Sequence, residues 1–180
     1  MGWNGDYCVA VTFYSPLIIV EEEKPVDPEN ITGGRFYVKW GATYYETEDG
    51  GLLQGLKKID GDYYFFNKNG TMKKDVNITI DGKTYYFDKN GKRFSGLLTK
   101  WGATYFFNDE MIYGFTNIGD NTYFFRPNTG AMVKDQFISA AGKTFFLKPD
   151  GTMAKDETIL KWTVMYQFDE DGHLVRTGRW

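Results

Sequence analysis

The chain has 180 residues, of which 18% are aromatic, with 21 Gly, 5 Pro and a net charge of −3. A single Cys and a single His exclude an internal disulfide and a Cys/His metal cluster, and no stretch reaches the roughly 18–20 apolar residues of a membrane span. Residues 35–180 carry 18 acids and 20 bases, which argues against the concentrated basic face that nucleic-acid binding needs.

Residues 1–34 do not repeat and are predicted to form an N-terminal β segment followed by a linker. The stretches 8–14 and 17–20 are apolar and typical of strands, and Cys8 is expected to be a small buried residue. Residues 21–34 hold two Pro, several acids and a double Gly, a linker composition. This segment is interpreted either as the end of a preceding domain or as a cover for an edge strand of the first hairpin.

Residues 35–180 contain one short pattern repeated about every 20 residues. The pattern ends on a turn at positions 50, 70, 91, 111, 130, 151 and 172. In each unit, consecutive aromatic residues are predicted to form a first strand, an Asn-Gly or Asp-Gly corner the turn, and a shorter strand the return. Because one such hairpin cannot bury its own apolar face, the spacing predicts an all-β solenoid of about seven stacked β-hairpin repeats.

A longer period lies over the short one. Lys-Trp occurs at 39–40, 100–101 and 161–162, with 61 residues between successive Trp, the length of three units. We therefore expect three hairpins per superhelical turn, with the three Trp on one edge of the solenoid.

Candidate ligand-binding residues follow from this period. The Trp occur once per three units, so they are not required to build every hairpin; the alternative is that each caps a superhelical turn. Adjacent lysines offer hydrogen-bond donors, and one Tyr per unit is expected to point outward with its hydroxyl available to a sugar. The predicted ligand-binding residues are Trp40, Trp101, Trp162, Lys39, Lys100, Lys161, Tyr45 and Tyr86.

Catalysis has little support in the residues. His173 is the lone His, there is no GxSxG element, and the acidic corner 169–172 lacks the remainder of a calcium loop. We predict a non-catalytic chain with no metal and no cofactor.

The segments GLKKIDGDYYFFNKNGTMKKD (55–75) and TIDGKTYYFDKNGKRFSG (79–96) resemble the cell-wall-binding repeats of Gram-positive surface proteins, toxins and phage lysins. This superfamily includes choline-binding and glucan-binding repeats. The resemblance covers roughly 35–180 and implies a hairpin solenoid that attaches a protein to a surface polymer outside the cell.

Choline-binding repeats usually carry Trp after the opening Gly and again before the Tyr-Tyr-Phe. Here the first position reads Leu56, Leu97 or Phe115, and the second Tyr63 or Thr84. These replacements place the sequence closer to the glucan-binding and toxin-like members, whose rings stack on sugars.

The predicted function is therefore binding of a bacterial cell-surface glycan, anchoring a partner domain or phage component of a secreted or phage-encoded protein to the envelope. Two alternatives stay open. One is a choline or teichoic-acid binding module, which needs a cage of three rings between adjacent hairpins. The other is a structural spacer or self-association module, which would form homo-oligomers.

Overall fold

The structure is a computed structural model that describes residues 27–179. The strands predicted at 8–14 and 17–20, and the surroundings of Cys8, lie outside the described residues. The described part consists of strands and turns, with no helix and therefore none that could cross a membrane.

Seven antiparallel hairpins follow one another along residues 35–168, numbered here hairpin 1 to hairpin 7. Their strands are β2 (Arg35–Lys39) and β3 (Ala42–Glu46), β4 (Gly55–Ile59) and β5 (Asp62–Phe66), β6 (Val76–Ile80) and β7 (Lys83–Phe87), β8 (Gly96–Lys100) and β9 (Ala103–Asn108), β11 (Gly114–Ile118) and β12 (Asn121–Phe125), β13 (Gln136–Ala140) and β14 (Lys143–Leu147), and β15 (Thr158–Lys161) and β16 (Val164–Phe168). Three further strands, β1 (Asn30–Ile31), β10 (Glu110–Met111) and β17 (Leu174–Arg179), each pair with one of them.

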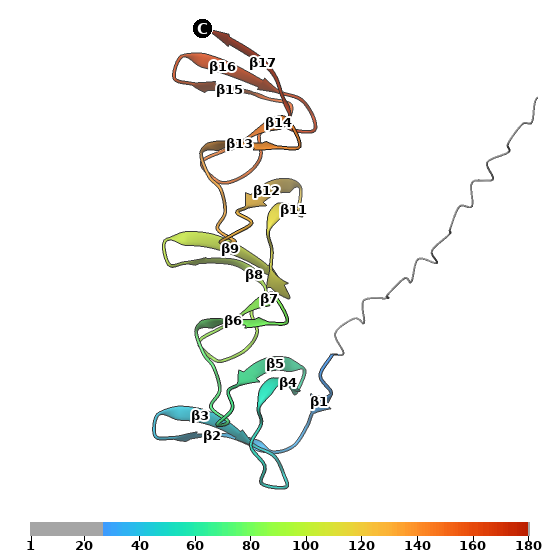
Figure 1. The fold of residues 1–180 in the computed structure, drawn as a ribbon, viewed down its shortest axis with the longest axis vertical. Coiled ribbons are helices and arrows are strands. Elements are labelled where there is room, and N and C mark those ends of the chain that lie inside the picture. Colours follow the sequence, from blue (N-terminus) through green and yellow to red (C-terminus); the bar gives the residue numbers. More distant parts are fainter. Residues whose placement is uncertain (1–26, 180) are drawn as a thin grey trace, which may run out of the picture.

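The hairpins stack into an elongated solenoid, which confirms the predicted fold class (Figure 1). Hairpins 1, 4 and 7 extend their tips to the same side, whereas hairpins 2 and 5 extend theirs to the other side (Figure 1). This arrangement agrees with three hairpins per turn and with a common edge for the Lys-Trp pairs.

The predicted position of the hairpin turn is wrong. The tight two-residue turns precede the aromatic strand, as at Asp60-Gly61, where both residues have positive φ (49° and 87°). The aromatic strand is therefore the second strand of each hairpin. A type I′ turn requires positive φ at both central residues and matches the twist of the flanking strands, which explains why the ladder closes there.

The Asn-Gly and Asp-Gly corners make the joints between hairpins instead. At the corner Asn69-Gly70, the Gly70 amide donates to Asn67 O at 2.9 Å, and only one bridge, Phe66 to Met72, follows. The Met72 amide then donates to Thr43 O of hairpin 1 at 2.7 Å, so the chain after the corner binds the preceding hairpin.

These corners require Gly for a steric reason as well as a conformational one. From Gly70 onward each corner Gly lies against a Leu or Met of the preceding unit: a Cβ on Gly91 would lie 2.7 Å from Met72 Cε, and one on Gly151 would lie 2.5 Å from Met132 Sδ. A positive φ (84° and 94°) adds to the requirement. The Gly corners thus set the close stacking of one hairpin on the next.

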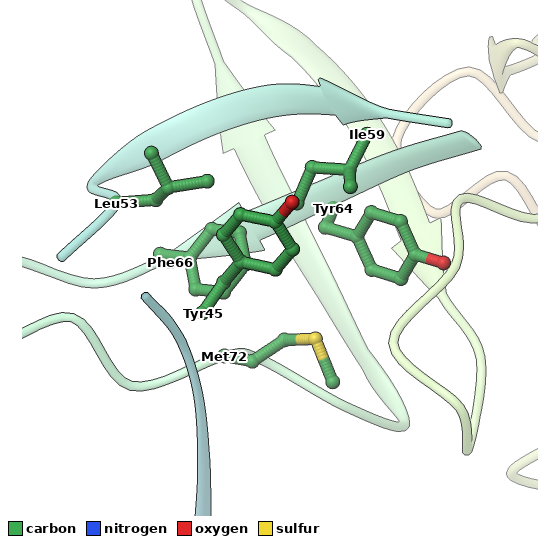
Figure 2. Packing of buried hydrophobic residues seen from close by; sticks show 6 residues of the cluster. All are labelled: Tyr45, Leu53, Ile59, Tyr64, Phe66 and Met72. Atoms are coloured by element: carbon green, nitrogen blue, oxygen red, sulfur yellow. The ribbon is translucent and has the colours of Figure 1, made fainter. Parts of the chain in front are cut away.

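The core is a column of buried side chains at the end of each aromatic strand. Its members from hairpin 2 onward are at most 2% exposed: Phe66, Phe87, Phe107, Phe125, Leu147 and Phe168. Burying a ring of this size contributes roughly 1.5–3 kcal/mol, so the column is a major source of stability. Figure 2 shows the layer between hairpins 1 and 2, with Tyr45, Tyr64 and Met72 around Phe66.

Part of the predicted linker is built into the solenoid. Asn30 and Ile31 pair in parallel with Lys58 and Ile59 of β4, so this segment covers an edge of hairpin 2 rather than of hairpin 1. The boundary between residues 1–34 and 35–180 stays a prediction.

Candidate functional site

Aromatic rings gather between neighbouring hairpins in a recurring arrangement. In hairpin 1, the Phe36 ring lies 4.8 Å from Tyr45 on the paired strand and 5.1 Å from Tyr64 of hairpin 2, centroid to centroid. Tyr45 and Tyr64 are buried, whereas Phe36 is 41% exposed. We call these three residues the 1/2 cluster.

Two further clusters repeat this geometry. The 5/6 cluster consists of Phe115, with Phe124 on the paired strand and Phe145 of the next hairpin, both at 4.8 Å. The 6/7 cluster consists of Phe137, Phe146 and Tyr166, with distances of 4.7 and 4.6 Å. Each has the three rings from two adjacent hairpins that the choline alternative requires.

A fourth group of rings uses the tip of hairpin 4. The Trp101 ring lies 6.0 Å from both Tyr86 of hairpin 3 and Tyr105 of its own hairpin, and these residues form the 3/4 cluster. Lys100 Nζ lies 5.3 Å from the Tyr86 ring and 5.0 Å from the Trp101 ring. The structure therefore brings together three predicted site residues: Tyr86, Lys100 and Trp101.

The three predicted Trp occupy the hairpin tips. Trp40, Trp101 and Trp162 are the first residues of their tight turns, with φ of 51°, 53° and 51°. A bulky residue in this region is strained, at roughly 1–3 kcal/mol. Their exposed fractions are 87%, 54% and 74%. Strained, exposed Trp contribute little to the core, which favours a role outside folding.

Two of the three neighbouring lysines, Lys100 and Lys161, are tied to the body of the solenoid by ion pairs. Lys100 forms an ion pair with Asp75, and Lys161 forms the equivalent pair with Asp135. Both amines also lie near ring faces: Lys161 Nζ is 5.1 Å from the Phe146 ring. The exposed fractions of the two Lys side chains are 23% and 16%, so they fix the Trp tips against the preceding hairpin. Lys39 lies over Trp40 at 4.3 Å.

The predicted outward-pointing tyrosines are in fact buried. Tyr45 is 2% exposed and donates its hydroxyl proton to Gly33 O, and Tyr86 is 4% exposed and donates to Asp75. Burial raises the pKa of both phenols. They face inward because the last residues of the aromatic strand pack on the neighbouring hairpin. Their rings take part in the clusters, whereas their hydroxyls are already hydrogen-bonded.

Between hairpins 2 and 3 lies a cleft of about 460 Å³, here the 2/3 cleft. The cleft is lined by Asp27, Pro28, Leu56, Tyr63, Lys83, Tyr85, Arg93, Asn108, Asp109 and Glu110. Arg93 stacks its guanidinium 3.7 Å from the Tyr63 centroid. The Tyr63 hydroxyl donates to Asp27, which lowers the pKa of that carboxyl together with Lys58. The sequence did not predict this site, although Leu56 and Tyr63 stand at the two positions where choline-binding repeats usually carry Trp.

The described residues contain no group of three His, Cys, Asp or Glu placed to hold a metal ion. The chemistry available between the hairpins is therefore that of ring faces, hydroxyls and paired charges. Such an arrangement binds cations and sugar faces.

Comparison with solved structures gives relatives with the same fold. Choline-binding protein F of Streptococcus pneumoniae, solved with a peptidoglycan analogue, is 23% identical, with a TM-score of 0.69 over 81% of this chain and 47% of that chain. The choline-binding domain of CbpL from the same organism is 24% identical, with a TM-score of 0.63 over 81% of this chain and 78% of that chain. A pneumococcal cell wall endolysin of phage Cp-1, solved with choline, is 22% identical, with a TM-score of 0.51 over 73% and 40%.

This chain spans about half the length of choline-binding protein F, as the 47% coverage shows. No curated protein matches it. At these identities the structural likeness establishes the fold alone.

The family of this chain is established by a sequence profile rather than by the structural likeness. A profile of the choline-binding repeat matches residues 53–96 and 112–157, together half of the chain. The expectation of a closer relation to the glucan-binding members is thereby corrected, because the profile that matches describes choline-binding repeats. The chain belongs to the choline-binding repeat family.

Proposed function

We propose that this chain is a non-catalytic attachment module that binds choline groups of a Gram-positive cell-wall polymer. One observation carries the proposal: three-ring clusters recur between adjacent hairpins of an elongated scaffold. Ring faces carry partial negative charge and attract a quaternary ammonium, which has no proton to donate to a polar site. Family membership supports the same ligand class.

The 1/2 and 5/6 clusters are the proposed choline sites. Their first-strand residues, Phe36 and Phe115, are 41% and 38% exposed, so a ligand reaches them from solvent. Within residues 27–179, the cation–ring contacts involve other rings, such as Tyr63, Tyr86 and Phe146. These two clusters carry no cation–ring contact from a Lys or Arg of the described residues, although Phe145 of the 5/6 cluster lies 5.3 Å from the His173 ring.

Binding at each site is expected to be weak. A cation over aromatic rings gains ~0.5–1 kcal/mol at an exposed site and ~2 kcal/mol when desolvated. A polymer that carries many choline groups engages several sites at once, and linked weak sites gain roughly 10²–10⁴-fold in avidity. The solenoid thus suits a repetitive ligand such as a choline-bearing teichoic acid at the bacterial surface, in a secreted or phage-encoded protein.

A second candidate function is stacking on a glycan by the three Trp tips. The observation that favours it is strained backbone at exposed Trp40, Trp101 and Trp162, on hairpins that extend to one side (Figure 1). An indole face stacks on the apolar face of a sugar ring. In this reading the lysines and Tyr86 orient the Trp, and the glycan runs along the edge.

The test is retention on purified walls whose teichoic acid carries choline, compared with walls that carry ethanolamine instead. Free choline and dextran serve as competitors. The variants are Phe36→Ala with Phe115→Ala, and the triple change Trp40→Ala, Trp101→Ala and Trp162→Ala. Leu97→Ala is the matched control, because Leu97 has the same strand position and 46% exposure but belongs to no ring cluster.

Retention on choline walls alone, released by choline and lost in the double Phe variant, is the expected result. Equal retention on both walls, blocked by dextran and lost in the Trp variant, would replace choline with a glycan. No retention on either wall, together with concentration-dependent sedimentation, would make the chain a spacer or self-association module.

A further inference from the structure

Arg93 occupies a position that holds an apolar side chain in neighbouring units. Each such residue follows a corner and bridges back to the aromatic strand; the others are Leu52, Met72, Met111, Met132 and Met153. The backbone is unchanged at Arg93: its amide donates to Tyr63 O of the preceding hairpin at 2.8 Å, as that of Met153 does to Thr122 O at 2.7 Å. The fold therefore does not require an Arg here.

The Arg93 side chain turns onto an aromatic face. Its guanidinium carbon lies 3.7 Å from the Tyr63 centroid, and Nη2 bonds Asp109 at 3.0 Å. The side chain is only 17% exposed. Asp109, with a φ of 66°, lies where hairpin 4 has lost its corner Gly. A Met–Gly contact is thus replaced by an ion pair stacked on a ring.

The surface covered by Arg93 belongs to the 2/3 cleft. Leu56 and Tyr63 have the strand positions of Phe115 and Thr122, and Tyr85 has that of Phe145. The cleft is therefore the counterpart of the 5/6 cluster, three hairpins earlier. Its lining holds three carboxylates against two cations, one of which is Arg93.

We infer that Arg93 is a built-in cation that occupies the ring face of the 2/3 cleft and excludes external choline from it. This inference rests on the proposed function, since it assigns one choline site fewer than the scaffold could offer. An external ammonium has to displace a guanidinium that is tethered beside the ring and neutralised by Asp109. A tethered competitor acts at a high effective concentration.

Removal of Arg93 is expected to create a site rather than to damage one. Tyr63 and Tyr85 line the vacated space with Leu56, and Asp109 loses its partner. The lining then holds three carboxylates against one cation, which favours entry of a cation. Lys58 Nζ also lies 5.1 Å from the Tyr63 centroid, farther than the 3.7 Å of Arg93, and stays paired with Asp27 at 3.0 Å outside the lining.

The test is calorimetric titration of the whole chain with choline. Arg93→Ala is expected to raise the stoichiometry by one site, and Arg93→Lys, which keeps a cation beside Tyr63, to leave it unchanged. Met132→Ala is the matched control, because Met132 has the same joint position, belongs to no ring cluster, and donates its amide to Thr104, which has no ring. Adding Tyr63→Leu to Arg93→Ala is expected to abolish the extra site.

A second readout does not depend on how well the variants fold. In the wild type, the Arg93 side-chain protons are expected to be shifted upfield by the Tyr63 ring, and saturating choline should leave them in place. Movement of these resonances toward solvent values with choline would overturn the inference.

The two proposals fail in different ways. If the wild type binds choline and Arg93→Ala gains no site, the Arg93 inference is wrong and the proposed function stands. If only Arg93→Ala binds choline, the inference stands and the proposed function is wrong. If neither binds, both are wrong.

Discussion

The 2/3 cleft and the 5/6 cluster are the same place in the solenoid, three hairpins apart, with different side chains. One has Leu56 and Tyr63 with a stacked Arg93, and the other has Phe115 with Phe124 and Phe145. Both use the same inter-hairpin backbone hydrogen bond, at 2.8 and 2.7 Å.

This comparison separates what builds the solenoid from what selects the ligand. Glycine corners, backbone hydrogen bonds and the buried column recur in both regions and position the strands. The side chains that differ are Leu56 against Phe115 on the first strand, Tyr63 against Thr122 on the second strand, and Arg93 against Met153 at the joint. The scaffold leaves these positions variable. A repeat family can therefore open or close single sites without changing its fold.

The largest expected effect is on the scaffold that both regions share. In Gly130→Ala, the new Cβ would overlap Met111 Sδ and lie 2.9 Å from its Cγ, at a φ of 69°. We expect a loss of about 1–3 kcal/mol from overpacking in addition to about 1–2 kcal/mol from backbone strain. Gly142→Ala, with a φ of 73° and open space, is the control and should show the strain alone. Urea denaturation of both variants measures the difference; equal losses would refute the steric account of the corners.

The second prediction tests whether the 5/6 cluster binds choline while the 2/3 cleft does not. Phe115→Ala removes the central ring of the 5/6 cluster and is expected to lower the choline stoichiometry by one site. Leu56→Ala, at the same strand position beside Arg93, should leave it unchanged. Calorimetric titration of the two variants checks this, and equal losses would contradict separate roles for the two regions.

The third prediction concerns the first-strand position of hairpin 3. Asn77 there carries a buried Oδ1 without a hydrogen-bond partner in the described residues. An unpaired buried polar atom costs about 1–3 kcal/mol, so Asn77→Leu is expected to stabilise the chain by about 1 kcal/mol. Asn117→Leu is the control, since Asn117 accepts a hydrogen bond from Thr122 at 2.7 Å. A thermal melt in which Asn77→Leu gains nothing would show that Oδ1 is satisfied.

The smallest effect is a difference in acid sensitivity between equivalent corners. The backbone amide and hydroxyl of Thr152 both donate to Asp150 and lower its pKa. A depressed carboxyl pKa stabilises the folded state above the ordinary aspartate pKa, and this contribution is lost as the pH falls through the folded pKa. The corner of hairpin 3 has Asn90 instead. Protection from hydrogen exchange near Asp150, taken relative to the intrinsic exchange rate at each pH, is therefore expected to fall at acid pH, and Asp150→Asn should remove this dependence; unchanged protection in the wild type would contradict it.

Much of the fold could be predicted from the sequence because repetition amplifies weak local signals. The 20-residue spacing and the 61-residue Trp period predicted stacked hairpins with a common edge. The turn was misplaced because both Asn69-Gly70 and Asp60-Gly61 are typical hairpin-turn sequences, and the prediction assigned the turn to the one that follows the aromatic strand. In the structure the Gly of both pairs has a positive φ. Which corner closes a ladder depends on packing against the preceding hairpin.

The site was harder to predict than the fold. Trp101, Lys100 and Tyr86 do come together, yet Tyr45 and Tyr86 are buried because strand ends face the neighbouring hairpin. The role of Arg93 depends on a contact with Tyr63, 30 residues earlier, which no local pattern reveals.

The most direct test is a crystal structure of this chain with choline. The account predicts a quaternary ammonium within about 6 Å of the ring centroids in the 1/2 and 5/6 clusters, and Arg93 still stacked on Tyr63. Choline on the Tyr63 face with Arg93 displaced, or choline bound at neither cluster, would contradict it.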